Sequence, residues 1–245
     1  MKFLRIQLLY LSLPLCIISI AQKAKTYTIT SPDGAIVLRE DTSDRMLWFV
    51  SHKSQSIIAP SPASLQLTTG ETLGNKASIT SAKTEKVAAN FTAVNCKKKV
   101  VHDNYNKLTL NCKDDYGIIF RACKDGVSYR FFTKKKGVIE LKNEEVVFNF
   151  NGDYNTLLPC VRDFRGKEQY IQSFEALYAD QTLSQVSKDT LAFLTVLVDV
   201  GNGKKVDVLD TGPEEYHDMV LKGAAGNPLK DEFAPFLTQQ PINNT

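Results

Sequence analysis

The amino-acid sequence predicts an all-β protein built as a large antiparallel sandwich. More than ten short runs rich in Val, Ile, Thr, Tyr and Phe alternate with period two, and turn residues bound each run. Segments with the 3.6-residue period of a helix are scarce. Many short strands with few helices are typical of a sandwich of antiparallel sheets.

The predicted strands follow one another along the whole chain. Pro32-Asp33-Gly34, Asp125-Gly126 and Gly201-Asn202-Gly203 contain residues that tolerate positive φ, and they predict tight turns between neighbouring runs. Two stretches lack the alternation: we expect residues 69–90 to form a long, weakly structured connection and residues 173–186 to form a loop that crosses the sheet. The predicted strands are residues 27–31, 36–41, 46–51, 65–68, 107–113, 118–124, 127–133, 146–150, 191–200, 204–209 and 219–222.

The N-terminus predicts a bacterial secretory signal over residues 1–21. Lys2 and Arg5 precede an apolar run over residues 6–20, which ends in the small-x-small pattern Ser19-Ile20-Ala21. A membrane-spanning helix needs about 20 apolar residues, and this run is shorter. We therefore expect an exported protein, periplasmic or extracellular, with no membrane attachment after cleavage. No Pro- or Gly-rich linker divides residues 22–245, which we interpret as one domain.

The charge balance argues against a nucleic-acid partner. The chain has 30 Lys and Arg residues and 27 Asp and Glu residues, for a formal net charge of +3. Nucleic-acid binding requires a stronger and clustered basic excess.

Cys96, Cys112, Cys123 and Cys160 remain after signal cleavage. Their even number permits disulfides in an oxidising compartment, and buried free thiols are the alternative.

Motifs for catalysis are few. His52, His102 and His217 lie in polar, turn-like contexts without zinc-site spacing, and we expect surface roles for all three. A glycosidase needs two carboxylates that flank the glycosidic bond, but the acidic residues show no pattern that selects a pair. Trp48 and Phe49 lie in an alternating run and are expected to be core residues rather than a sugar platform.

Several segments, taken together, resemble a known family. They include Tyr116-Gly117-Ile118-Ile119-Phe120-Arg121, followed by Asp125-Gly126, and the later Asn151-Gly152-Asp153-Tyr154. The order of these pieces is similar to that of the N-terminal domain of glycoside hydrolase family 97, and the resemblance covers essentially the whole mature chain. The segments that carry it are residues 30–34, 116–131, 148–155, 173–178, 186–199 and 215–221.

The resemblance implies a fold and an accessory function. Family 97 enzymes are exported bacterial α-glucosidases and α-galactosidases with an N-terminal β-super-sandwich, similar to galactose mutarotase, and a catalytic (β/α)8 barrel. The family places its catalytic carboxylates on the barrel. The chain is thus expected to lack the barrel, to carry no catalytic residue and to be inactive alone.

The family also implies a metal ligand and partners. Its sandwich donates one carboxylate to a calcium ion at the active site, and the matching residue here is Glu175. Calcium takes about 6 to 8 oxygen ligands, so tight binding is expected only when the barrel is present. The expected partners are a glycan substrate and a barrel, in cis or in trans.

Two other functions remain open from the sequence. The domain could be a free-standing periplasmic carbohydrate-binding module, although the chain has a single Trp. It could also be a mutarotase-type sugar epimerase, which needs a carboxylate base and a histidine acid. The sequence does not distinguish a natural short protein from a truncated or split gene.

Overall fold

The computed structural model describes residues 25–94, 99–161, 170, 176–211, 219–224, 226 and 228–233. These residues form strands with one short 3-10 helix, which confirms the predicted all-β sandwich. No helix in the described part of the chain has the length and apolar character needed to cross a membrane. Residues 1–21, the predicted signal, lie outside the described residues.

The largest sheet has nine strands in the order β1-β2-β3-β4-β10-β17-β16-β13, with β5 paired to β4. Its neighbouring strands pair in the antiparallel sense throughout. Its strands are β1 (Lys25–Thr30), β2 (Ile36–Thr42), β3 (Met46–His52), β4 (Gln55–Leu67), β5 (Thr72–Leu73), β10 (Leu141–Phe148), β13 (Leu191–Ala192), β16 (Met219–Gly223) and β17 (Leu229–Phe233).

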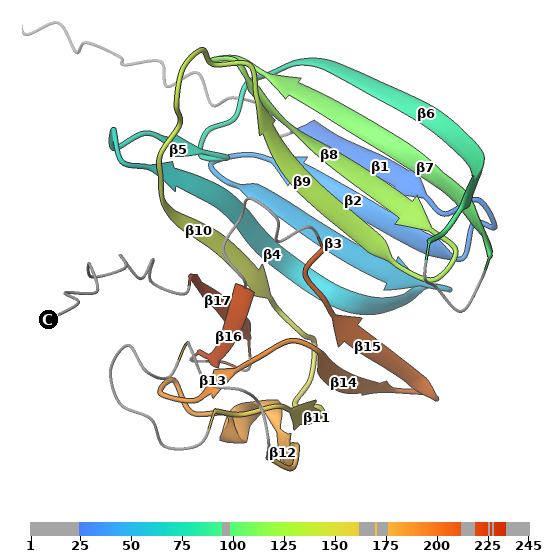
Figure 1. Ribbon diagram of the computed structural model, residues 1–245, viewed down its shortest axis with the longest axis vertical. Coiled ribbons are helices and arrows are strands. Elements are labelled where there is room, and N and C mark those ends of the chain that lie inside the picture. The colour runs from blue at the N-terminus through green and yellow to red at the C-terminus, as the bar shows by residue number, and fades with distance from the viewer. Residues whose placement is uncertain are drawn as a thin grey trace, which may run out of the picture.

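Two four-stranded sheets complete the fold. One has the order β6-β7-β8-β9 and lies over β1, β2 and β3, so that the two layers form the sandwich in Figure 1. The other has the order β12-β11-β14-β15 and lies below it in the same view. The strands are β6 (Ile79–Thr92), β7 (Val100–Cys112), β8 (Tyr116–Cys123), β9 (Val127–Thr133), β11 (Asn155–Leu158), β12 (Ala179–Thr182), β14 (Val196–Gly201) and β15 (Lys204–Val208).

The core follows from the alternation of the strands. In β2 the side chains of Ile36, Leu38, Glu40 and Thr42 point inward, and in β8 the even-numbered residues from Tyr116 to Ala122 do the same. Leu38, Leu110, Ile118 and Phe120 are fully buried between the two layers. Burial of this apolar surface is the main force that holds the sheets together.

Two predictions about loops were wrong. Residues 69–90 contain β5 and most of β6, which pairs with β7 along nearly its whole length. Because β6 is an edge strand whose residues are mostly exposed, it carries polar residues on both faces and shows no alternation. Residues 173–186 contain β12 and the 3-10 helix η2 (Leu183–Gln185), whose short length gives too few positions for a periodic signal.

Candidate functional site

Glu175, the predicted calcium ligand, lies outside the described residues. The structure does describe the two strands on either side of it in the sequence. β11 and β12 are antiparallel, with Asn155 opposite Thr182 and Leu158 opposite Ala179. Residues 159–178, which include Glu175, therefore start and end at the same end of this two-strand ladder.

The other end of the ladder is fixed by Asp153. Its Oδ1 accepts a hydrogen bond from the Ser184 amide at 2.8 Å, and its Oδ2 accepts one from Ser184 Oγ at 2.6 Å. The Ser184 hydrogen bonds lower the pKa of Asp153 because they favour the charged carboxylate. The amide of Leu183 donates to the Tyr154 carbonyl at 2.9 Å. We call β11 and β12, the two strands on either side of Glu175 in the sequence, the Glu175 stem. Both backbone and side-chain contacts hold this stem together.

The two faces of this stem differ. Thr156 and Leu158 are buried against the body of the domain, whereas Leu157, Leu177 and Tyr178 are exposed. Leu177, only two residues after Glu175, is 90% exposed. Leu157 lies opposite Leu197 of β14, so the outer face of the small sheet has an apolar centre.

The described residues do not form a complete metal site by themselves. No group of three or more His, Cys, Asp and Glu side chains among them could hold a metal ion. A single glutamate supplies one or two of the about 6 to 8 oxygens that calcium takes. Any calcium ion at Glu175 would need most of its ligands from elsewhere.

The two described histidines, His52 and His102, lie on different strands. His52 ends β3, and its carbonyl accepts a hydrogen bond from Lys204 Nζ at 3.1 Å. His102 is on β7 and its Nδ1 lies 2.6 Å from Asn90 Oδ1 at an exposed position. His217 lies outside the described residues.

Trp48 and Phe49, both predicted to be core residues, lie on opposite faces of β3. Trp48 is in the core as predicted, but Phe49 lies on the opposite face beneath Arg39, because neighbouring strand residues point to opposite sides.

Three described cysteines, Cys112, Cys123 and Cys160, are free thiols, and Cys96 lies outside the described residues. Burial raises the pKa of all three thiols, that of Cys112 to about 11. A thiol with a raised pKa is mostly protonated at neutral pH, and the thiolate is the reactive form. These positions are therefore poor candidates for nucleophiles.

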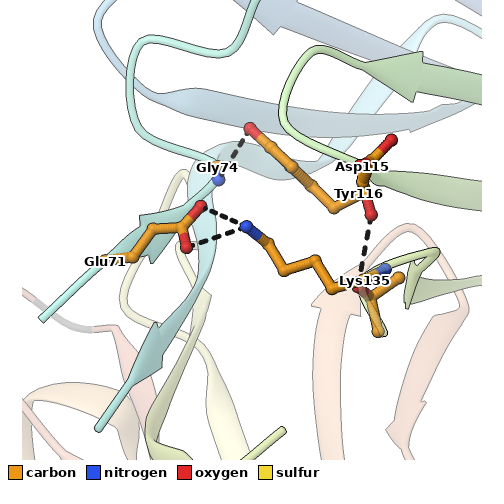
Figure 2. Close-up of polar contacts among 6 residues, drawn as sticks. Glu71, Gly74, Asp115, Tyr116 and Lys135 are labelled. Carbon is orange, nitrogen blue, oxygen red and sulfur yellow. Dashed lines mark hydrogen bonds and ion pairs between the residues drawn. The ribbon is translucent and has the colours of Figure 1, made fainter. Parts of the chain in front are cut away.

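A second polar cluster joins β5 to the β8–β9 region (Figure 2). Lys135 Nζ lies 3.0 Å from both carboxylate oxygens of Glu71, and the Gly74 amide donates to the Tyr116 hydroxyl at 3.2 Å. Burial raises the pKa of Tyr116 and keeps its hydroxyl neutral. We interpret the cluster as structural, because each group already has a partner within the fold.

Two buried carboxyl groups were missed by the sequence analysis. Glu40 is 1% exposed and Asp231 is 5% exposed. Burial raises the pKa of Glu40 well above its ordinary range and that of Asp231 to about 7. The alternation of β2 contains the signal for Glu40, since residues 36, 38 and 40 share one face. Asp231 lies in the middle of the five-residue strand β17, which is too short to show an alternation of buried and exposed residues.

The comparisons with known proteins agree on one family. The model of the glycosyl hydrolase 97 N-terminal domain matches residues 29–239. The chain is 30% identical over 226 residues to a retaining alpha-galactosidase of Bacteroides thetaiotaomicron, an alignment that covers 91% of this chain and 34% of that protein. The chain thus spans about a third of the length of this curated relative.

Solved structures share the fold. A glycoside hydrolase family 97 enzyme from Pseudoalteromonas sp. strain K8, in complex with acarbose, superposes with a TM-score of 0.73 at 18% identity, over 85% of this chain and 32% of that one. A beta-arabinopyranosidase superposes with a TM-score of 0.74 at 22% identity, over 84% of this chain and 35% of that one. With the match to the N-terminal model over most of its length, the chain belongs to glycoside hydrolase family 97 and contains its N-terminal domain.

Proposed function

We propose that this domain is the accessory sandwich of an exported family 97 glycosidase that acts on α-linked glycans. The observation that carries the proposal is the match of the N-terminal family model to residues 29–239, in a chain that spans 34% of a retaining alpha-galactosidase. The sandwich would shape the active site of a catalytic (β/α)8 barrel, present in cis or in trans.

Cleavage of this polypeptide after Ala21 would produce a protein that begins at Gln22. Intact-mass analysis of the exported protein tests that site, and a retained residue 1–21 segment would contradict it.

The proposal assigns the bond-breaking step to the barrel. Retaining hydrolysis uses two carboxyl groups about 5 to 5.5 Å apart, one as acid and base and one as nucleophile. Several carboxylates described here already have structural partners: Glu71 pairs with Lys135, Glu85 with Lys107, Asp199 with Lys205, and Asp153 accepts two hydrogen bonds from Ser184. Such engaged groups are poorly suited to proton transfer or nucleophilic attack.

Glu175 would donate one calcium ligand across the domain boundary. Its stem supports this role, since β11 and β12 fix both ends of residues 159–178 and Asp153 holds the stem in register. When bound, calcium would supply a Lewis acid that orients the reacting part of the substrate. The exposed Leu157 and Leu177 beside the stem would be covered by the barrel.

Calcium affinity tests the assignment of Glu175. Calorimetry on the isolated chain should give binding no tighter than about the millimolar range of weak extracellular sites. In the enzyme assembled with its barrel, Glu175→Gln should weaken calcium affinity and lower activity without changing the melting temperature of the sandwich. Asp180→Asn, an exposed carboxylate change on β12, is the matched control and should leave both unchanged. If Glu175→Gln leaves calcium-dependent activity intact, or unfolds the isolated chain, Glu175 is not a ligand.

A further inference from the structure

A row of polar side chains crosses the otherwise apolar interior of the sandwich. The register of β1 to β4 places Tyr27 opposite Glu40, Glu40 opposite Trp48, and Trp48 opposite Ser61. The parallel row two residues away is apolar and consists of Ile29, Leu38, Val50 and Ile58. Glu40, Trp48 and Ser61 are 1%, 4% and 0% exposed, so these three members of the polar row are as deeply buried as the apolar row beside it.

Most polar atoms near this row have partners within the protein. Ser61 Oγ donates to the Ala59 carbonyl at 2.8 Å and accepts from the Asn149 amide at 3.0 Å. On the facing sheet, Cys112 and Tyr116 interact by a side-chain hydrogen bond, and the Tyr116 hydroxyl also accepts from Gly74. Within the described part of the chain, Glu40 Oε1 and Trp48 Nε1 are buried and have no hydrogen-bond partner.

These two atoms are chemically complementary. Residues directly opposite each other on neighbouring antiparallel strands have Cβ atoms about 4.5 to 5.5 Å apart. The indole Nε1–H is only a donor, and the carboxyl Oε1 is an acceptor. A buried polar atom without a partner costs on the order of a full desolvation penalty, so proteins rarely leave such atoms unpaired.

The protonation of Glu40 indicates which kind of ligand Glu40 and Trp48 could bind together. Burial, with a smaller effect of Asp41, raises the pKa of Glu40 well above its ordinary range and so favours the neutral form of the carboxyl group. A neutral carboxyl group and an indole N–H offer no charge that would bind a metal ion or an anion. Water both donates and accepts, and internal waters typically make about three hydrogen bonds to polar groups that lack other partners.

We propose that the sandwich binds one internal water molecule between β2 and β3, which donates a hydrogen bond to Glu40 Oε1 and accepts one from Trp48 Nε1. This water completes the polar row and joins the two strands through their side chains. Its site is separate from the Glu175 stem, and it does not depend on the presence of a catalytic barrel.

The single Trp of the chain makes the proposal directly testable. In the folded chain labelled with 15N-tryptophan, the one indole N–H resonance should show a cross-peak to a long-lived water in water-selective NOE and ROE spectra. Glu40→Gln keeps the acceptor and should keep the cross-peak. Glu40→Met fills similar volume without an acceptor, and the cross-peak should disappear.

Two further measurements exclude other sources of the signal. Tyr129 has an exchangeable phenol and its ring centroid lies 5.5 Å from that of Trp48, so the cross-peak must survive in Tyr129→Phe. A high-resolution crystal structure should place a water within hydrogen-bond distance of both Glu40 Oε1 and Trp48 Nε1, even if Glu40→Met does not fold. A missing cross-peak in the unmodified chain, its persistence in Glu40→Met, or a direct Glu40–Trp48 hydrogen bond in the crystal would overturn the proposal.

Discussion

Asp231 shows how one side chain can connect strand geometry to proton binding. β17 pairs with β10 through Val147 and Phe148, and at the next residue the Val146 amide donates to Asp231 Oδ1 at 2.8 Å. The carboxyl therefore replaces a backbone acceptor where the ladder ends. Burial is the main reason that its pKa rises to about 7; Glu144 and Glu145 add to the rise, while the Val146 hydrogen bond and Lys230 oppose it.

This raised pKa predicts a stability that falls with increasing pH. Below about pH 4 the carboxyl is protonated in both states, and between about pH 4 and 7 the unfolded chain releases its proton while the folded chain keeps it. The unfolding free energy should therefore decrease over this range and level off above it. Since one pKa unit corresponds to about 1.4 kcal/mol, the full effect is on the order of 4 kcal/mol at most.

Asp231→Asn should remove this pH dependence and keep the acceptor for Val146. Urea unfolding should show the variant to be more stable than the unmodified chain at about pH 8 and similar to it below about pH 4. Asp153→Asn is an instructive control because the pKa of Asp153 is lowered, so it should reduce stability at neutral pH. An unfolding free energy of Asp231→Asn that tracks the unmodified chain at both pH values would show that Asp231 does not titrate in this way.

At the scale of elements, β5 is held to the facing sheet by two contacts of unequal strength. The Tyr116 hydroxyl accepts a hydrogen bond from the buried Gly74 amide. Glu71 and Lys135 form an ion pair in which both side chains are partly exposed (Figure 2). Tyr116→Phe would leave the amide without an acceptor and should cost about 1 to 3 kcal/mol. Glu71→Gln should cost about 0.2 to 1 kcal/mol. Chemical denaturation of the two variants measures the difference, and an equal or reversed order would contradict this ranking.

The contact between β16 and the segment that follows η2 allows no side chain at Gly223. A Cβ there would lie 2.1 Å from the Val186 carbonyl oxygen, which belongs to the backbone and cannot turn aside. Gly223→Ala should therefore destabilise the fold by about 1 to 3 kcal/mol or more. At Gly126 a Cβ would meet no atom within 4 Å and φ is not positive, so Gly126→Ala is the matched control. Thermal unfolding should show a clear loss for the first variant and almost none for the second.

The sequence predicts the strands in which more buried and more exposed residues alternate regularly, and it misses strands without that regular pattern. β2, β3, β8 and β9 coincide closely with predicted runs, because their buried faces enforce alternation. β6 was missed because, as an edge strand exposed on both faces, its composition is that of a loop. β11, β12 and β17 are short and are placed by long-range pairing, which local patterns do not contain.

The candidate site was less predictable than the fold. Family resemblance pointed to Glu175, but the Asp153–Ser184 contacts that hold its stem join residues 31 positions apart. Asp231 acquires its raised pKa from burial against β10, which no local motif reveals. Glu40 could have been found from the alternation of β2 alone, as a charged residue on a buried face.

At the scale of the whole molecule, we propose that this sandwich supports glycoside hydrolysis by a catalytic barrel and does not itself cleave the bond. The match of the N-terminal family model and the ion pairs formed by Glu71 and Glu85 support this proposal. The purified chain should fold as an independent sandwich, with a circular dichroism spectrum dominated by strand and a helix content far below about a third.

Hydrolysis of aryl α-galactosides and α-glucosides by the purified chain tests the claim most directly. We expect no turnover above the buffer rate, because the two cooperating carboxylates of the retaining mechanism would lie in the barrel. Activity should appear only when the barrel is supplied, and it should then respond to Glu175→Gln but not to Asp180→Asn. Turnover by the purified chain alone that a single Asp or Glu substitution within it abolishes would contradict the account.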